Sequence, residues 1–143
     1  MELFRPEPIL VPVLALVAWT LVMQAWLIIA RIPAMRAAGL DAQDAQRTAD
    51  LAARMPPQAQ WKADNYNHLM EQPTIFYATA LALALAGLGD GLYLWLAWFY
   101  VASRVVHSLV HATTNVVMLR LGVFALGTFA LLIMVAVGIV DLL

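Results

Sequence analysis

Hydrophobic and polar positions divide the chain into four long apolar segments and one long polar connection. The apolar segments run from Ile9 to Ala30, from about Gln72 to Gly89, from Leu92 to about Met118, and from Leu121 to Val140. About 20 consecutive apolar residues are enough for a helix to cross the hydrocarbon core of a bilayer. The pattern therefore predicts an all-α integral membrane protein, with helices over about 9–31, 64–88, 92–118 and 120–141.

The later segments are joined by short connections. Leu88-Gly89-Asp90-Gly91 has the composition of a tight turn, because glycine and aspartate favour turn conformations. Short connections join antiparallel neighbours. Residues 1–143 are therefore expected to form one domain, a four-transmembrane-helix up-down bundle.

The connection over about 32–63 carries most of the positive charge. Five of the eight basic residues lie in it or at its borders, namely Arg31, Arg36, Arg47, Arg54 and Lys62, whereas Arg5 alone lies near the N-terminus. The positive-inside rule then places this loop in the cytoplasm and both termini on the opposite side. Within the loop, 34–38 and 41–53 are expected to be helical, with breaks at Gly39 and at Met55-Pro56-Pro57.

The composition supports the membrane prediction and excludes several function classes. The chain is 64% hydrophobic and 12% charged, whereas an ordinary soluble domain is about half apolar and a quarter charged. It contains no cysteine, so the protein itself supplies no disulfide and no thiol nucleophile. A net charge of -1 gives no basic surface for nucleic acid.

Three polar residues interrupt the third apolar segment. Arg104, His107 and His111 are spaced by three and four residues, which places them on one helix face. A charge inside a membrane is costly unless it faces protein or water, so this face is expected to point inward and to mark a functional site. Glu71 is the predicted ion-pair partner of Arg104, and that pair alone would suit a purely structural role. His68 is the only other histidine, and no metal site is predicted.

Further polar residues are expected at the cytoplasmic end of the same bundle. They are Arg31 at the end of the first helix, Asp64, Asn67, His68 and Glu71 at the start of the second, and Arg120 at the start of the fourth. Asn67 and Glu71 are four residues apart and share a helix face. Pro73 is expected to kink the second helix just after Glu71.

Two stretches carry a family resemblance. Residues 67–73 read Asn-His-Leu-Met-Glu-Gln-Pro, and residues 103–111 read Ser-Arg-Val-Val-His-Ser-Leu-Val-His. With Arg31 and Arg120, they resemble the central signature of the MAPEG superfamily, the membrane-associated proteins in eicosanoid and glutathione metabolism, in a bacterial-type member.

The resemblance implies a homotrimer that binds glutathione as a cosubstrate at each subunit interface. Arg120 matches the arginine that stabilises the glutathione thiolate, and Arg31 matches a glutathione contact from the first helix. The other binding residues that it implies are Glu71, Arg104 and His107, with Asn67 or His68 near the place of an asparagine and His111 in the place of a tyrosine. The implied activity is a glutathione-dependent transferase or peroxidase, acting on a lipophilic small molecule that enters from the membrane lipids.

A second function class stays open because the chain departs from that pattern. Between residues 61 and 68 only Lys62 is basic, where glutathione-using members carry several arginines, and Leu121 stands where some members have a serine. The alternative is a non-catalytic membrane protein of the same fold that binds an unknown small ligand or partner. A proton or ion pathway is weaker, because the sequence has no inverted repeat or paired broken helices.

Small residues along the last helix also favour an oligomer. Close contact between membrane helices needs small side chains. Those expected to face a neighbouring subunit are Gly122, Gly127, Ala130 and Gly138.

Overall fold

The computed structural model describes residues 6–41 and 43–143, which form helices joined by turns. Arg5, counted above among the basic residues, lies outside these ranges. In chain order the elements are α1 (Leu10–Ala37), the 3₁₀-helix η1 (Gln43–Ala45), α2 (Thr48–Ala52), α3 (Pro57–Leu69), α4 (Pro73–Leu85), α5 (Leu92–Thr113) and α6 (Val117–Leu142).

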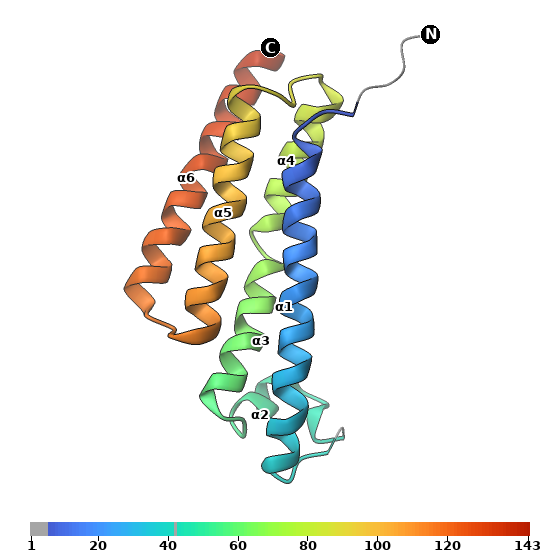
Figure 1. The fold of residues 1–143 in the computed structure, drawn as a ribbon, viewed down its shortest axis with the longest axis vertical. Helices are drawn as coiled ribbons and strands as arrows, with labels where there is room; N and C mark the ends of the chain where they lie inside the picture. Colours follow the sequence, from blue (N-terminus) through green and yellow to red (C-terminus); the bar gives the residue numbers. More distant parts are fainter. Residues whose placement is uncertain (1–5, 42) are drawn as a thin grey trace.

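The helices form parallel and antiparallel columns along one long axis (Figure 1). One column is α1, the next is α3 continued by α4, and α5 and α6 lie beside each other. The C-terminus and the α4–α5 turn lie at one end of the molecule, here called the terminal end. The segment between α1 and α3 lies at the other end, here called the loop end.

The surface of the bundle is strongly apolar. Both α1 and α6 are long and apolar enough to cross a bilayer. Large apolar side chains project outward from several helices, among them Ile29, Trp95 and Phe129, of which Trp95 is 76% exposed. Proteins that face water on all sides rarely expose apolar patches of this extent. The surface is therefore suited to lipid or to other apolar helices.

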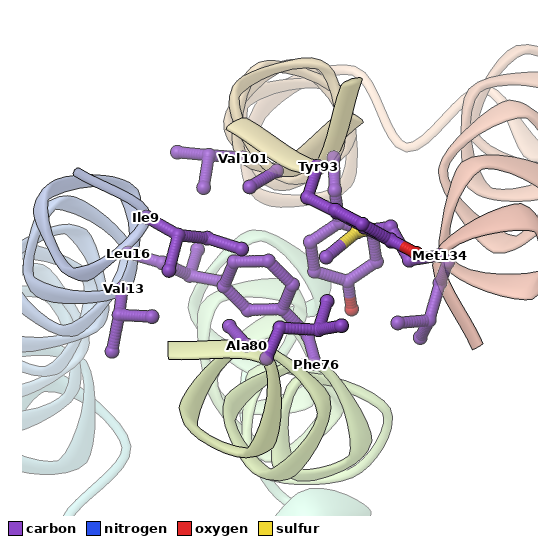
Figure 2. Close-up of a cluster of buried hydrophobic side chains, with 12 residues drawn as sticks. Ile9, Val13, Leu16, Phe76, Ala80, Tyr93, Val101 and Met134 are labelled. Carbon is purple, nitrogen blue, oxygen red and sulfur yellow. The ribbon is translucent and has the colours of Figure 1, made fainter. Parts of the chain in front are cut away.

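The main hydrophobic core fills the half of the molecule nearer the terminal end (Figure 2). Phe76 of α4 stacks on Tyr100 of α5 with ring centroids 4.6 Å apart. Leu16 from α1 and Met134 from α6 close the cluster from the other two sides, and both are fully buried. All the long columns thus meet in one core, which fixes the helix arrangement that positions the rest of the molecule.

Helix α1 extends beyond its predicted end near residue 31 and stops at Ala37. The charge of Arg31 marks the end of the apolar segment but does not stop the helix. Beyond it, Ala34 and Met35 pack against a small core of Leu40, Leu51, Met55 and Ala59. The helix ends before Gly39, whose φ of 66° suits glycine. The predicted break at Gly39 is confirmed.

The single helix predicted over 64–88 is two helices. Helix α3 begins at Pro57, because proline is favoured in the first turn of a helix, and it ends at Leu69. Helix α4 begins at Pro73, which has no N–H to donate back into α3. The helix is therefore interrupted over 70–72, at the position where the sequence predicts a kink. This interruption is called the break below.

The break is tied to the neighbouring helices by side chains. The Gln72 amide nitrogen donates to Thr128 Oγ1 of α6 at 2.8 Å, and the Tyr100 hydroxyl donates to Gln72 Oε1 at 3.3 Å. Because these bonds join α4, α5 and α6, the polar groups at the break are satisfied inside an otherwise apolar bundle.

Three of the four small residues of α6 do not face outward as predicted. An added Cβ at Gly127 would collide with Ser103 of α5, one at Gly138 would lie 3.1 Å from Leu83, and Ala130 is buried. These residues let α6 approach α4 and α5 within the chain. Only Gly122 faces open space.

The predicted loop over 32–63 contains ordered structure at its exposed surface. The Asp41 backbone N–H donates to Asp44 Oδ2 at 2.9 Å, and Arg54 Nη1 donates to Asp44 Oδ1 at 2.9 Å. These donors lower the pKa of the Asp44 carboxyl below its ordinary value, with the backbone N–H as the larger cause. The Arg54–Asp44 contact joins the residues after α2 to the segment before it, and the Asp41–Asp44 contact closes a turn within that segment.

Candidate functional site

A cleft lies among α3, α5 and α6, whose arrangement Figure 1 shows, in the half of the molecule nearer the loop end. Its volume is about 540 Å³, within the range of small-molecule sites. The lining residues are Asp64, Asn67, His68, Glu71, His107, His111, Val117, Arg120, Leu121 and Phe124. They come from the end of α3, the end of α5 and the start of α6.

The α3 side of the cleft is one helix face followed by the first residues of the break. Asp64 and His68 are four residues apart and Asn67 lies between them, so all reach the same side. Glu71, just past the helix, bonds through Oε2 to Nδ1 of His68 at 3.0 Å. This local pair orients the imidazole and leaves the other ring nitrogen of His68 free to meet a ligand.

The α5 side of the cleft adds two buried histidines. The ring centroids of His68 and His107 lie 4.9 Å apart, and those of His107 and His111 lie 5.6 Å apart. Nδ1 of His107 and Nδ1 of His111 are buried without a hydrogen-bond partner in the described part of the chain. Within residues 6–41 and 43–143, no group of three or more His, Asp or Glu side chains is arranged to hold a metal ion.

The α6 side brings the arginine of the cleft. Arg120 is half-buried, and its Nη1 donates to Asn115 Oδ1 at 2.8 Å. Asn115 lies in the turn between α5 and α6 with a φ of 50°, a conformation that asparagine tolerates better than most residues. The turn thus holds one edge of the guanidinium and leaves the other donors of Arg120 for the cleft.

Two predicted site residues do not line this cleft. Arg31 lies half-buried on α1, outside the lining. Arg104 is only 1% exposed, and its Nη2 donates to the backbone oxygen of His68 at 3.2 Å. The predicted ion pair of Arg104 with Glu71 is wrong in the single chain, because Glu71 is exposed beyond the helix end and bonds to His68 instead.

Sequence reasoning placed Asp64 among the polar residues at this end of the bundle without naming it as a binding residue, and it missed other residues that shape the cleft. Asn115 had a weak signal, as a polar residue in the turn between two apolar segments. Val117 and Phe124 are ordinary apolar residues in the sequence, and nothing there separates them from residues that face lipid.

Comparison with known protein families identifies the family of the chain. The family model described as the MAPEG family matches residues 9–140, nearly the whole chain. The chain belongs to the MAPEG family. The cleft of this MAPEG protein gathers six of the eight residues that the resemblance nominated, from both signature stretches and from α6. No curated protein and no solved structure matched the chain.

The cleft offers a defined set of chemical groups to a ligand. Arg120 supplies a permanent positive charge, Asp64 and Glu71 supply carboxylates, and His68 supplies an imidazole nitrogen. Val117, Leu121 and Phe124 add an apolar wall. This combination suits a ligand that has both an anionic or polarisable part and an apolar part.

Proposed function

We propose that this MAPEG protein is a glutathione-dependent transferase or peroxidase that acts on lipophilic electrophiles. Arg120 is the group that activates the thiol. The observation that carries the proposal is the position of Arg120 in one cleft with Asn67, His68, Glu71 and the two histidines of α5. That set contains residues from both stretches that resemble the family signature.

The proposed activation is electrostatic. The thiolate is the reactive form of a thiol, and an ordinary cysteine thiol with a pKa of about 8.5 is mostly protonated at neutral pH. A guanidinium beside the sulfur favours the thiolate, and each unit of pKa lowering raises its fraction about tenfold. The thiolate sulfur then bonds to the electrophilic carbon, and the leaving group departs with the bonding electron pair.

The lipophilic substrate is proposed to meet the apolar wall of the cleft. Val117 and Leu121 line the cleft and are also more than half exposed on the outside of α6. A path along α6 therefore leads from the apolar surface of the bundle to the position of Arg120. This route lets a membrane-dissolved electrophile approach the sulfur without crossing water.

The proposal includes four membrane crossings, with the segment 38–56 in the cytoplasm and both termini on the other side. Helix α5 has 22 residues and so spans about 33 Å, enough for the hydrocarbon core. Helix α4 alone has 13 residues and spans only about 20 Å. The second crossing therefore uses α4 together with the end of α3, which brings His68 and Glu71 to the membrane boundary.

We also propose that the working form is a homotrimer. The cleft of one chain contains a single arginine, although glutathione carries two carboxylates. Arg31 is kept away from the cleft of its own chain, so an interface between copies is the means by which it can reach the ligand. The exposed apolar side chains of α1 and α6 supply the surface for such packing.

A second candidate function is binding without catalysis. The cleft holds two carboxylates, Asp64 and Glu71, against the one arginine, Arg120. This balance favours a ligand with a net positive charge over glutathione, which carries two carboxylates and one amino group. The same fold would then bind a cationic ligand or a partner rather than activate a thiol.

The test measures the bound thiolate directly. Purified protein is mixed with glutathione near neutral pH, and the ultraviolet absorbance of the thiolate is compared between wild type and Arg120→Ala. The wild type should show the signal. In the variant the signal should be lower by a factor of about ten or more, because a rise of one unit in the pKa of the bound thiol lowers the thiolate fraction by that factor. Turnover of a generic electrophile should fall in parallel.

Controls separate this effect from a general loss of charge. Arg120→Lys keeps the charge without the planar fork and should retain part of the signal. Arg36→Ala removes an exposed arginine of α1 outside the cleft and should change nothing. Absence of a thiolate signal and of glutathione binding in the wild type would refute the catalytic proposal and favour the binding function.

A further inference from the structure

Arg104 is a buried cation without a counter-ion. Its side chain uses Nη2 for the His68 carbonyl, while Nε and Nη1 are buried without a hydrogen-bond partner. Within the described residues no carboxylate oxygen lies within 4.0 Å of it. A guanidinium stays protonated in proteins, and a buried charge is unfavourable unless it is paired. Nε and Nη1 lie on different edges of the guanidinium, so two separate donors point into the protein interior without an acceptor in the described part of the chain.

A second copy of the chain cannot supply the acceptor by surface contact. The residue is already 1% exposed within a single chain, so a neighbour packed on the outside would not touch the two free donors. The acceptor must reach them from a space inside the chain. The cleft adjoins Arg104, because His68, whose backbone oxygen accepts from Arg104, and His107, one turn along α5, both line it.

Phe124 contacts Arg104 and also lines the cleft. Its ring centroid lies 5.4 Å from Cζ of Arg104, so the ring faces the cation. The same ring lies 5.2 Å from the His68 ring and 5.9 Å from the His107 ring, centroid to centroid. Phe124 lines the cleft and Arg104 does not. The aromatic ring thus meets both the cleft and the buried cation.

An aromatic ring is a replaceable partner for this cation. A cation–π contact satisfies no N–H donor, whereas a carboxylate can accept two parallel hydrogen bonds from a guanidinium. Phe124 also lies among rings rather than in the main core of the terminal half. A rotation of Phe124 about its side-chain bonds would remove the cation–π partner of Arg104 on the side of the cleft.

We propose that Phe124 is a gate that determines which ligands reach Arg104. When the ring moves, a carboxylate of the ligand enters and accepts a hydrogen bond from the free Nη1 donor. A ligand without an anionic group leaves the gate closed and Arg104 buried. The inference deepens the proposed function, since it assigns one ligand carboxylate to a second arginine behind the cleft.

The test labels arginine side chains with phenylglyoxal in the full chain, purified in detergent, and locates the adducts by peptide mass spectrometry. In the wild type Arg120 should react while Arg104 stays protected. In Phe124→Ala the labelling rate of Arg104 should rise at least about tenfold, a factor that corresponds to about 1.4 kcal/mol of closing free energy. Added acetate should slow the labelling of Arg104 in this variant by occupying the exposed guanidinium.

Two further variants keep the result interpretable. Phe129→Ala removes an exposed phenylalanine of the same helix and should leave Arg104 protected. Phe124→Met keeps most of the apolar volume without a ring and should give an intermediate rate even if the alanine variant folds poorly. Equal labelling of Arg104 in the wild type and both Phe124 variants overturns the gate.

The labelling needs no glutathione, so the gate and the proposed function fail separately. Labelling of Arg104 that depends on Phe124, in a protein that does not bind glutathione, supports the gate and refutes the glutathione activity. Glutathione binding together with an Arg104 that stays unreactive in every Phe124 variant refutes the gate alone.

Discussion

Asn115 has two separate roles in the turn between α5 and α6. Its backbone adopts a positive φ, and its side chain accepts the hydrogen bond that orients Arg120. Asparagine can do both, whereas alanine does neither and glycine does only the first. The backbone role and the hydrogen-bonding role can therefore be separated by substitution.

Asn115→Gly should leave the thermal midpoint nearly unchanged but lower the bound-thiolate signal, because Arg120 loses its acceptor. Asn115→Ala should lower the signal as well and also destabilise the fold by about 1 kcal/mol through backbone strain. Thermal unfolding in detergent and thiolate absorbance measure the two effects. If Asn115→Gly keeps the full thiolate signal, Asn115 does not position Arg120.

Glu71 and Arg104 should behave as independent residues. Glu71 is 68% exposed in its side chain and bonds locally to His68, so Glu71→Gln should cost less than about 1 kcal/mol. Arg104→Met removes an unpaired buried charge and should leave the thermal midpoint unchanged or raise it. A double-mutant cycle should give a coupling free energy near zero. A coupling of several kcal/mol would restore the ion pair predicted from the sequence.

Residue spacing predicted which side chains line the cleft better than it predicted which side chains form an ion pair. His107 and His111 could be placed on one face because helix periodicity alone fixes that relation. The Glu71–Arg104 pair could not be tested in this way, since it depends on where the helix breaks and on a local competitor, His68. Phe124 was invisible for a related reason, because an aromatic side chain that closes a cleft has the same sequence signature as one that faces lipid.

Helices α5 and α6 approach each other closely at Gly127. A methyl group there would collide with Ser103, so Gly127→Ala should destabilise the protein by about 1–3 kcal/mol. Ser103→Ala combined with Gly127→Ala should recover much of that loss. Gly122→Ala, one to two turns earlier on the same helix and in open space, should be neutral or slightly stabilising. Thermal midpoints of the four proteins in one detergent test this order.

Helix boundaries followed local chemistry more than the apolar runs suggested. Pro57 starts α3 inside the predicted loop over 32–63, and Pro73 starts α4 inside the single helix predicted over 64–88. At the other boundary, α1 continues past Arg31 because Ala34 and Met35 have apolar partners from the following segment. Hydropathy marks the apolar zone, whereas proline, glycine and tertiary contacts set where the helices start and stop.

The orientation of the whole molecule can be tested with single cysteines, because the chain has none of its own. Gln46 lies exposed at the loop end and Leu143 at the terminal end. With the loop in the cytoplasm, a membrane-impermeant maleimide should label Gln46→Cys and Leu143→Cys from opposite sides of sealed vesicles. Labelling of both from one side would contradict the proposed topology.

The clustering of the main core at the terminal end also separates two kinds of sequence change. Residues that hold the helices together, such as Phe76 and Met134, lie nearer one end, and the residues that line the cleft lie nearer the other. Substitutions in the cleft therefore remove little of the packing on which folding depends. Such a layout lets a protein acquire a new ligand preference over successive mutations while it stays above the stability threshold for folding.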